Sequence, residues 1–110
     1  MLKISIGSEP KQKINVLFED TQIVLNLTYR PTIASWTMNL EYKDEPLILG
    51  KKLTMGISLL RQLNKPFDIL LLEKQNTGID PFKQDDFIDR VEFFILEREE
   101  LKEIRGYDVI

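Results

Sequence analysis

The sequence predicts an all-β fold: a small antiparallel β-sandwich or partly open barrel of about seven strands, with one short helical turn and a charged C-terminal extension. Apolar and polar residues alternate with a period of two through most of the first 55 residues. Turn-forming residues recur at intervals of about ten residues, which is typical of small all-β domains. The length of 110 residues suits one domain with a single core.

The N-terminal half contains the most regular predicted strands. A short strand is expected at residues 4–6, and longer ones at residues 13–20, 21–30 and 35–43. Each places apolar side chains on one face and polar ones on the other, as expected for antiparallel strands with one face on a core. Trp36 is in phase with the apolar residues of its strand, which favours a core position.

Turn and bulge residues separate these strands. Glu19-Asp20 and the segment 43–45 are predicted as tight reversals. Pro31 is expected to end or edge a strand because proline has no N–H to donate. Gly50 interrupts a short apolar run, which indicates a β-bulge.

The C-terminal half is less regular. Residues 67–74 are apolar on both faces, which predicts a central, doubly covered strand, and residues 90–98 behave similarly. Residues 59–63 fit either one helical turn or a short strand followed by a loop. No linker is visible, so we expect one β-rich domain at 1–97 and a C-terminal extension at 98–110.

Composition narrows the function classes. The net charge is −3 and no basic run occurs, which argues against nucleic-acid binding. The chain has no cysteine and no histidine, so disulfides, thiolate sites and the commonest general base are excluded. We expect no membrane segment and no cofactor, and a protein that stays in the cytosol or leaves it by a route other than secretion.

The stretch GIDPFKQDDFIDR, residues 78–90, is the strongest candidate for a chemical site, because it holds Asp80, Asp85, Asp86 and Asp89. A calcium loop requires oxygen ligands at alternating positions and a closing glutamate, and this spacing fails. A catalytic carboxylate pair requires a defined separation across a cleft, and no pair is marked as buried.

A structural role explains more of this stretch. Gly78 and Asp80-Pro81 are typical of a turn. Asp85 is expected to cap a short helical turn with its side chain, and Phe87 and Ile88 to close the end of the core. Asp89 and Arg90 are expected to stay solvated or to pair only weakly.

These motifs also carry a resemblance. The run PFKQDDFIDRVEFFIL, residues 81–96, and the order of strands and turns over residues 4–53 resemble the plug protein family of the contractile-tail baseplate described in cyanophages, with relatives in tailed phages and prophages. The resemblance spans roughly residues 2–97. The structural motif that it shares with this chain consists of Trp36, Gly50, Asp80, Pro81, Asp85 and Asp86.

The resemblance implies a structural virion component and no enzyme activity. Such a protein would lie near the tail axis, contact hub and spike proteins, and be assembled in the cytoplasm of the bacterial host. It would be a homo-oligomer, with three copies the natural number at a threefold hub. The alternative is a ligand- or carbohydrate-binding β-sandwich in which exposed aromatic residues such as Trp36 or Tyr107 stack on a ligand.

The C-terminal extension has too little apolar surface to fold alone. Leu101 and Ile104 predict one short amphipathic helical turn. Beyond it, Tyr107, Val109 and Ile110 form an apolar cluster that is unusual for a solvated tail. Either these residues fold back onto the sandwich or fray, or they are candidate contacts with a neighbouring protomer or with the hub.

Overall fold

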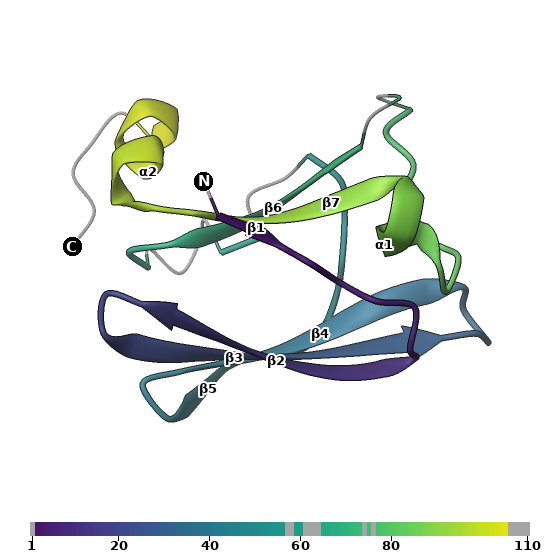
Figure 1. Cartoon of the computed structure of the whole chain (residues 1–110), viewed down its shortest axis with the longest axis horizontal. Helices are drawn as coiled ribbons and strands as arrows, with labels where there is room; N and C mark the ends of the chain where they lie inside the picture. The colour runs from purple at the N-terminus through teal and green to yellow at the C-terminus, as the bar shows by residue number, and fades with distance from the viewer. Residues whose placement is uncertain (1, 57–58, 61–64, 74, 76, 106–110) are drawn as a thin grey trace.

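The computed structural model describes residues 2–56, 59–60, 65–73, 75 and 77–105, with side chains up to residue 101 (Figure 1). The described residues form seven strands in two antiparallel sheets that face each other across one core. This confirms the all-β prediction. Because the two sheets do not join into a closed barrel, the fold is the sandwich form of that prediction.

The larger sheet has four strands in sequence order: β2 (Lys11–Phe18), β3 (Thr21–Arg30), β4 (Ser35–Tyr42) and β5 (Glu45–Lys52). They correspond to the alternating segments of the sequence. Along β3 and β4 the inward-facing apolar residues are almost completely buried. The alternation therefore set both the strand positions and the face that each strand turns to the core.

Two tight reversals connect β2 to β3 and β4 to β5. Both central residues of each turn have positive φ: Glu19 47° and Asp20 63° in the first, Lys43 56° and Asp44 62° in the second. Two-residue hairpin loops require this geometry, because it matches the right-handed twist of the flanking strands. The two predicted reversals are confirmed.

Gly50 lies where β5 departs from regular pairing with β4. The register shifts between Met38 and Leu40, so that Leu49 and Gly50 lie opposite Asn39. Gly50 has a φ of 64° and its N–H donates to Asn39 Oδ1 at 2.6 Å. Glycine accommodates this backbone without steric cost.

The smaller sheet has the order β1 (Leu2–Ile4), β7 (Val91–Leu96), β6 (Asp68–Glu73). The prediction that the segment containing β6 is the central strand is therefore wrong, since β7 is central and pairs with both neighbours.

The reason is that a non-strand segment covers the free side of β6. Gly56 N–H donates to Leu71 O at 3.0 Å, and Leu59 N–H donates to Ile69 O at 3.1 Å. Leu59 and Leu60 are buried there, and the rest of the 59–63 prediction lies outside the described residues. These hydrogen bonds occupy the edge of β6 where the prediction implied a neighbouring strand. The predicted covering of both faces is only partial, because Leu72, on the face opposite Ile69 and Leu71, is 39% exposed.

Two helices lie at opposite ends of the sandwich (Figure 1). α1 (Asp86–Asp89) is one turn long, and α2 (Arg98–Arg105) follows β7 directly. The single turn predicted for the extension is an eight-residue helix, and its Leu101 is fully buried. Neither described helix has the length and apolar character needed to cross a bilayer.

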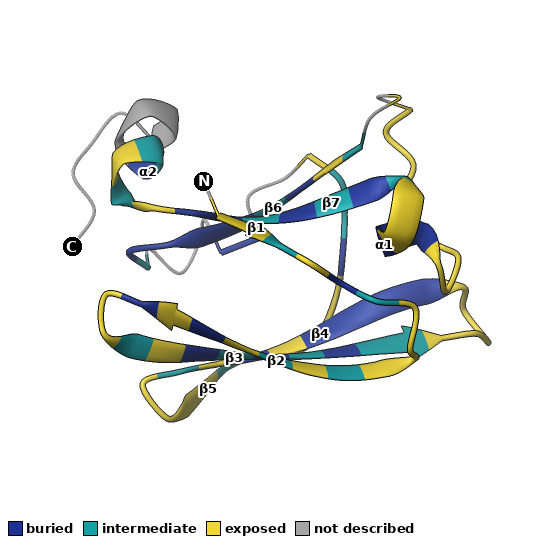
Figure 2. Cartoon of the chain, viewed as in Figure 1, coloured by how far each residue is buried: buried dark blue, intermediate teal, exposed yellow. Residues whose placement is uncertain are grey.

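The core lies between the two sheets, and buried residues alternate with more accessible ones along most strands (Figure 2). Both sheets and the segment before β6 contribute to it. Its largest fully buried side chains are Trp36, Phe67, Phe93, Ile23, Leu25, Leu27, Met38, Leu40, Leu53, Leu60, Ile69 and Leu71.

Candidate functional site

The residues singled out from the sequence gather at the end of the sandwich beside α1, which residues 78–90 close. We call this segment the acidic loop. It starts after β6 and leads through α1 into β7, so its two ends are anchored on neighbouring strands of the smaller sheet. Any chemistry of the four aspartates must take place here.

Arg90 organises the acidic loop. It donates from Nε and Nη2 to the two carboxylate oxygens of Asp86, both at 3.1 Å, and from Nη1 to Glu73 Oε2 at 2.7 Å. It also donates to the carbonyls of Ile79 at 2.9 Å and Asp80 at 3.1 Å. Its side chain is only 20% exposed. The prediction that Arg90 stays solvated or pairs weakly is therefore wrong.

Asp86 is the second centre of the loop. Its Oδ2 also accepts the amides of Phe82 at 2.7 Å and Lys83 at 2.8 Å. Asp85 does occupy the position before α1, but its side chain makes no capping hydrogen bond, so that part of the prediction is wrong. The helix is a single turn, and Asp86 Oδ2 instead accepts the amides of the residues before it, which holds the turn leading into α1.

Two further carboxylates near this end, those of Glu73 and Asp80, also have hydrogen-bond partners. Glu73 Oε1 accepts the hydroxyl of Thr77 at 2.6 Å and the amide of Gly78. Asp80 Oδ1 accepts the amide of Met55 at 2.9 Å, and its Oδ2 lies 3.9 Å from Lys52 Nζ. Asp80 thus ties the acidic loop to the segment that follows β5.

The protonation equilibria reflect these contacts. Burial acts to raise the pKa of Asp86, but hydrogen bonds from Arg90 and the two loop amides outweigh it, and the pKa is lowered. The pKa of Glu73 is lowered, chiefly by the hydrogen bond from Thr77. The pKa of the Arg90 guanidinium is raised, chiefly by its hydrogen bonds to Asp86. All three groups are therefore charged at neutral pH.

The acidic loop is also bonded to the opposite sheet. Trp36 Nε1 donates to Lys83 O at 3.0 Å, and Tyr29 Oη donates to Phe82 O at 2.8 Å. The Trp36 ring packs on Tyr29 with centroids 5.5 Å apart and edge-on to Phe87 at 5.4 Å. Because Trp36 is fully buried, it presents no face on which a ligand could stack.

The remaining residues of the loop divide by exposure. Pro81 and Phe87 are buried, as expected for residues that close the core. Ile88 is 60% exposed, so the prediction that it helps to close the core is wrong. Asp85 and Asp89 are exposed. In a single-turn helix only one side can face the core, and Phe87 occupies it.

The hydrogen bonds among Asp86, Glu73 and Arg90 stabilise the acidic loop and leave these three side chains little capacity to bind a substrate. Within the described ranges, no group of three or more acidic side chains is placed to hold a metal ion. Sequence reasoning missed Arg90 and Glu73. The spacing of four residues between Asp86 and Arg90 was a usable signal, because such pairs lie on one face across a helical turn. No comparable signal marks Glu73, which reaches the loop only through the pairing of β6 with β7.

Exposed apolar side chains lie elsewhere on the surface and are better candidates for contacts with other proteins. The large ones among the described residues are Leu2, Leu17, Ile33, Leu49, Leu72, Ile79, Phe82 and Ile88. Leu2 and Leu17 line a shared hollow with Phe18 and Ile95, at the end of the sandwich that carries α2. Tyr107, Val109 and Ile110 lie outside the described residues.

Comparison with known proteins gives one family. Residues 1–99 match the family model described as "Cyanophage baseplate Pam3 plug gp18". The match includes all seven strands and α1, and it ends within the first turn of α2. A search of curated proteins found no significant match.

Proposed function

The chain belongs to the cyanophage baseplate plug family, and from this premise we propose that it acts as a plug-like structural component of a phage or prophage tail baseplate, through protein–protein assembly and without catalysis. The observation that carries the proposal is the extent of the family match, which takes in both sheets and the acidic loop. The family is one of phage baseplate structural components, and its location is the tail baseplate.

The contacts of the acidic loop support a role without catalysis. A general acid or base needs a carboxyl group that can reach a substrate proton. Asp86 and Glu73 instead accept hydrogen bonds from Arg90 and from neighbouring backbone or hydroxyl groups. We propose that one structural motif acts only through its conformation and keeps the two sheets in a fixed relative position. Neighbouring baseplate proteins then contact the same outer surface in every copy. The motif consists of Trp36, Gly50, Asp80, Pro81, Asp85 and Asp86.

We further propose the finer features of this role. The partners are hub and spike proteins near the tail axis, and the protein is a homo-oligomer, with three copies in the assembly. Assembly takes place in the cytoplasm of the bacterial host. Residues 1–97 form the plug-like domain, and the extension 98–110 supplies partner contacts through Tyr107, Val109 and Ile110.

Purified tail particles provide the test. Quantitative mass spectrometry of particles from the phage or prophage that encodes this chain should find it in the baseplate fraction, in a copy number that is a multiple of three. Particles produced without it should lack a density near the tail axis. Detection of the protein only in the host lysate, with tails complete and infectious without it, would overturn the proposal.

A matched pair of variants distinguishes assembly from folding. Ile33→Ser changes an exposed side chain in the β3–β4 turn, 61% accessible, and should leave the fold intact. Trp36→Ala empties the core three residues further along. If Ile33→Ser is folded but no longer enters particles, Ile33 lies at a contact with another baseplate protein. If only Trp36→Ala fails to enter particles, the failure reflects lost stability of the fold.

Two aromatic residues were named for the alternative of a ligand- or carbohydrate-binding sandwich. Trp36 is buried between Tyr29 and Phe87 and presents no face to a ligand, and Tyr107 lies outside the described residues.

A further inference from the structure

The two sheets have four edges, and they are protected very differently. The outer edge of β6 receives hydrogen bonds from the amides of Gly56 and Leu59. The edge at β5 carries Pro46 and the bulge at Gly50. Proline and bulges are devices that discourage pairing with another strand. The edges at β1 and β2 remain, and both lie toward the viewer in Figure 1.

Of these two, β2 is the better template for a further strand. β1 is only three residues long. β2 has eight residues in unbroken register with β3, from Lys11 opposite Thr28 to Phe18 opposite Thr21. In the described part of the chain no segment pairs with its other side. Alternate residues of such an edge strand turn unpaired N–H and C=O groups outward.

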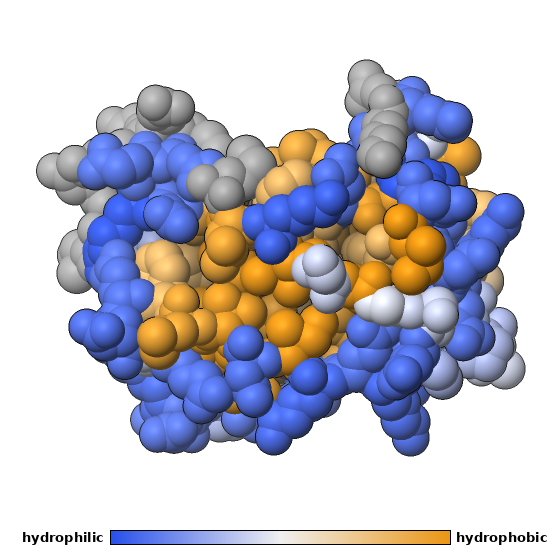
Figure 3. Space-filling model, in the orientation of Figure 1, coloured by the Kyte–Doolittle hydropathy of each residue, from blue (hydrophilic) through white to orange (hydrophobic). Residues whose placement is uncertain are grey.

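Apolar surface lies directly beside this edge. In the space-filling view an apolar field extends across the open side of the sandwich, between polar rims (Figure 3). Ile4 and Ile14 are only partly buried there, and Gln12, Val16 and Phe18 complete the inward face of β2. A strand added to β2 would bury apolar side chains on its inner face.

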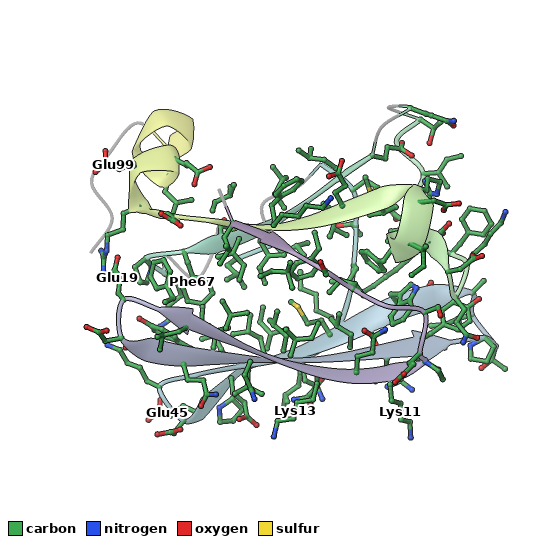
Figure 4. All side chains as sticks on the ribbon, viewed as in Figure 1. Lys11, Lys13, Glu19, Glu45, Phe67 and Glu99 are labelled. Atoms are coloured by element: carbon green, nitrogen blue, oxygen red, sulfur yellow. The ribbon has the colours of Figure 1, made fainter. Side chains whose placement is uncertain are left out.

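The outer face of the same edge is basic. Lys11 and Lys13 are exposed and point away from the smaller sheet (Figure 4). Among the described residues, the ion pairs of this region join Lys3 to Glu92 and Arg98 to Glu19, and neither Lys11 nor Lys13 takes part in them. Two copies of β2 placed edge to edge would bring four lysines onto one face, which disfavours self-pairing. The edge instead fits a strand with apolar residues on one side and an acid on the other.

We propose that residues 106–110 of a second copy of this chain, Gly-Tyr-Asp-Val-Ile, add as an antiparallel strand to the free edge of β2. In the register that puts Asp108 opposite Lys13, Tyr107 falls opposite Ile14 and Val109 opposite Gln12. Tyr107 and Val109 then cover the apolar field, and the carboxylate of Asp108 lies against the lysine side chains. This deepens the proposed function by naming the surface that the extension contacts, and it rests on that proposal for its role in the baseplate.

The position of α2 favours an added strand from another copy. The helix begins beside Glu19, at the Phe18 end of β2, where Arg98 Nε donates to Glu19 Oε2 at 2.6 Å. Its eight residues carry the chain about 12 Å, and Figure 1 shows α2 over the end of the smaller sheet, on the side away from β2. The three residues from Arg105 to Asp108 span at most roughly 11 Å. We therefore assign the added strand to another copy of the chain, and the test below includes binding within one chain as an outcome.

A contact between the extension of one copy and the β2 edge of the next is heterologous, because it joins two different surfaces. Such contacts either close into rings or continue as filaments. A ring of three copies is the outcome that matches the proposed threefold location.

Sedimentation velocity of the purified full-length chain provides the test, with the truncation after Arg105 as the first variant. The full chain should self-associate to trimers as its concentration rises, and the truncated chain should sediment as a monomer throughout. Lys13→Glu should weaken self-association at least tenfold. Lys51→Glu is the matched control, an exposed lysine on the edge strand β5 of the same sheet, and should change it less than twofold. The double variant Lys13→Glu/Asp108→Lys should recover most of the lost association.

Three results would overturn the inference: unchanged association after truncation, equal effects of the two lysine substitutions, or a monomeric full-length chain at every concentration. If the full-length chain is monomeric, hydrogen exchange of the β2 amides distinguishes the remaining possibility. Faster exchange of these amides after truncation would show that the extension binds within its own chain. Particle analysis separates this outcome from the fate of the proposed function. A truncated chain that remains in baseplates with unchanged self-association refutes only the strand addition, whereas absence of the full chain from particles refutes the baseplate role.

Discussion

The two ends of the sandwich are held together by different forces. At the end closed by the acidic loop, side chains bond to the opposite layer: Trp36 and Tyr29 of the larger sheet donate to carbonyls of the loop, and Arg90 binds two carboxylates. At the end that carries α2, the described polar link between the layers is an exposed ion pair of Arg98 with Glu19. Phe67 packs there against Phe18 and Tyr42, with ring centroids 5.4 and 5.0 Å apart.

This difference shows why a dense group of charged residues is a poor guide to function here. Asp86, the buried carboxylate of the acidic loop, accepts four hydrogen bonds on its two oxygens, as low-polarity surroundings require. The groups that remain available for a partner are the backbone of an edge strand and the side chains beside it. The closed end and the free edge of β2 are therefore separate parts of this fold.

The largest predicted effect is at Trp36. Trp36→Ala removes a fully buried indole and should lower the free energy of unfolding by about 3–5 kcal/mol, as measured by urea titration. Trp36→Phe keeps an aromatic ring but loses the hydrogen bond to Lys83 O, and should cost clearly less. Equal losses for both variants would mean that the bond to the loop, and not the packing, dominates at this end.

A matched pair of arginine variants tests the comparison between the two ends directly. Arg90→Ala leaves the carboxylates of Asp86 and Glu73 buried without their cation, and should cost about 3 kcal/mol. Arg98→Ala breaks a pair whose side chains are 38% and 48% exposed, and should cost only about 0–1 kcal/mol. Thermal melts and urea titrations measure both. A loss at Arg98 as large as that at Arg90 would contradict the distinction drawn between the two ends.

Acid should destabilise the protein partly through the acidic loop. The pKa values of Asp86 and Glu73 are lowered in the folded state, so their contribution to stability is fully present above the ordinary carboxyl pKa of about 4 and is lost as pH falls through the folded values. The urea midpoint should therefore be nearly constant from neutral pH down to about 5 and fall below about 4. In Asp86→Asn the fall should be shallower. An equally steep fall in that variant would show that other carboxyl groups dominate.

The sequence contained much of the fold and less of the site. Alternation of apolar and polar residues located β2, β3 and β4, although Leu17 interrupts it in β2, because a period of two has one interpretation when one face is buried. The turns at Glu19-Asp20 and Lys43-Asp44 were recognisable from polar residues between alternating runs. The position of β6 was predicted wrongly, because a strand covered by a loop has the same apolar pattern as a central strand.

The role of Arg90 was missed for a related reason. Local sequence shows only that Asp86 is four residues away, whereas three of the five hydrogen bonds of Arg90 go to Glu73, Ile79 and Asp80, placed by strand pairing and by the path of the loop. Similarly, Asp85 stands at the position where a capping residue is expected, and it was the neighbouring Asp86 that formed the hydrogen bonds. Local patterns identify turns well, but the partners of a charged side chain depend on tertiary structure.

The smallest predicted effect concerns divalent cations at the closed end. Calcium requires six to eight oxygen ligands. Asp86 already binds Arg90 and two amides, and Asp80 Oδ1 accepts the amide of Met55. Ligation by Asp86 would displace the guanidinium and leave it partly buried without its main partner, a cost that the exposed Asp85 and Asp89 cannot offset. Calorimetric titration with Ca²⁺ or Mg²⁺ should give no heat of binding, and the melting temperature should not rise with either ion. The variant Asp85→Asn/Asp89→Asn should behave identically, since it removes the only two loop aspartates that are fully available to solvent. Binding tighter than about 10⁻⁴ M, the affinity of weak extracellular calcium modules, would show that the acidic loop is a cation site. If the double variant abolished that binding, the site would lie on Asp85 and Asp89.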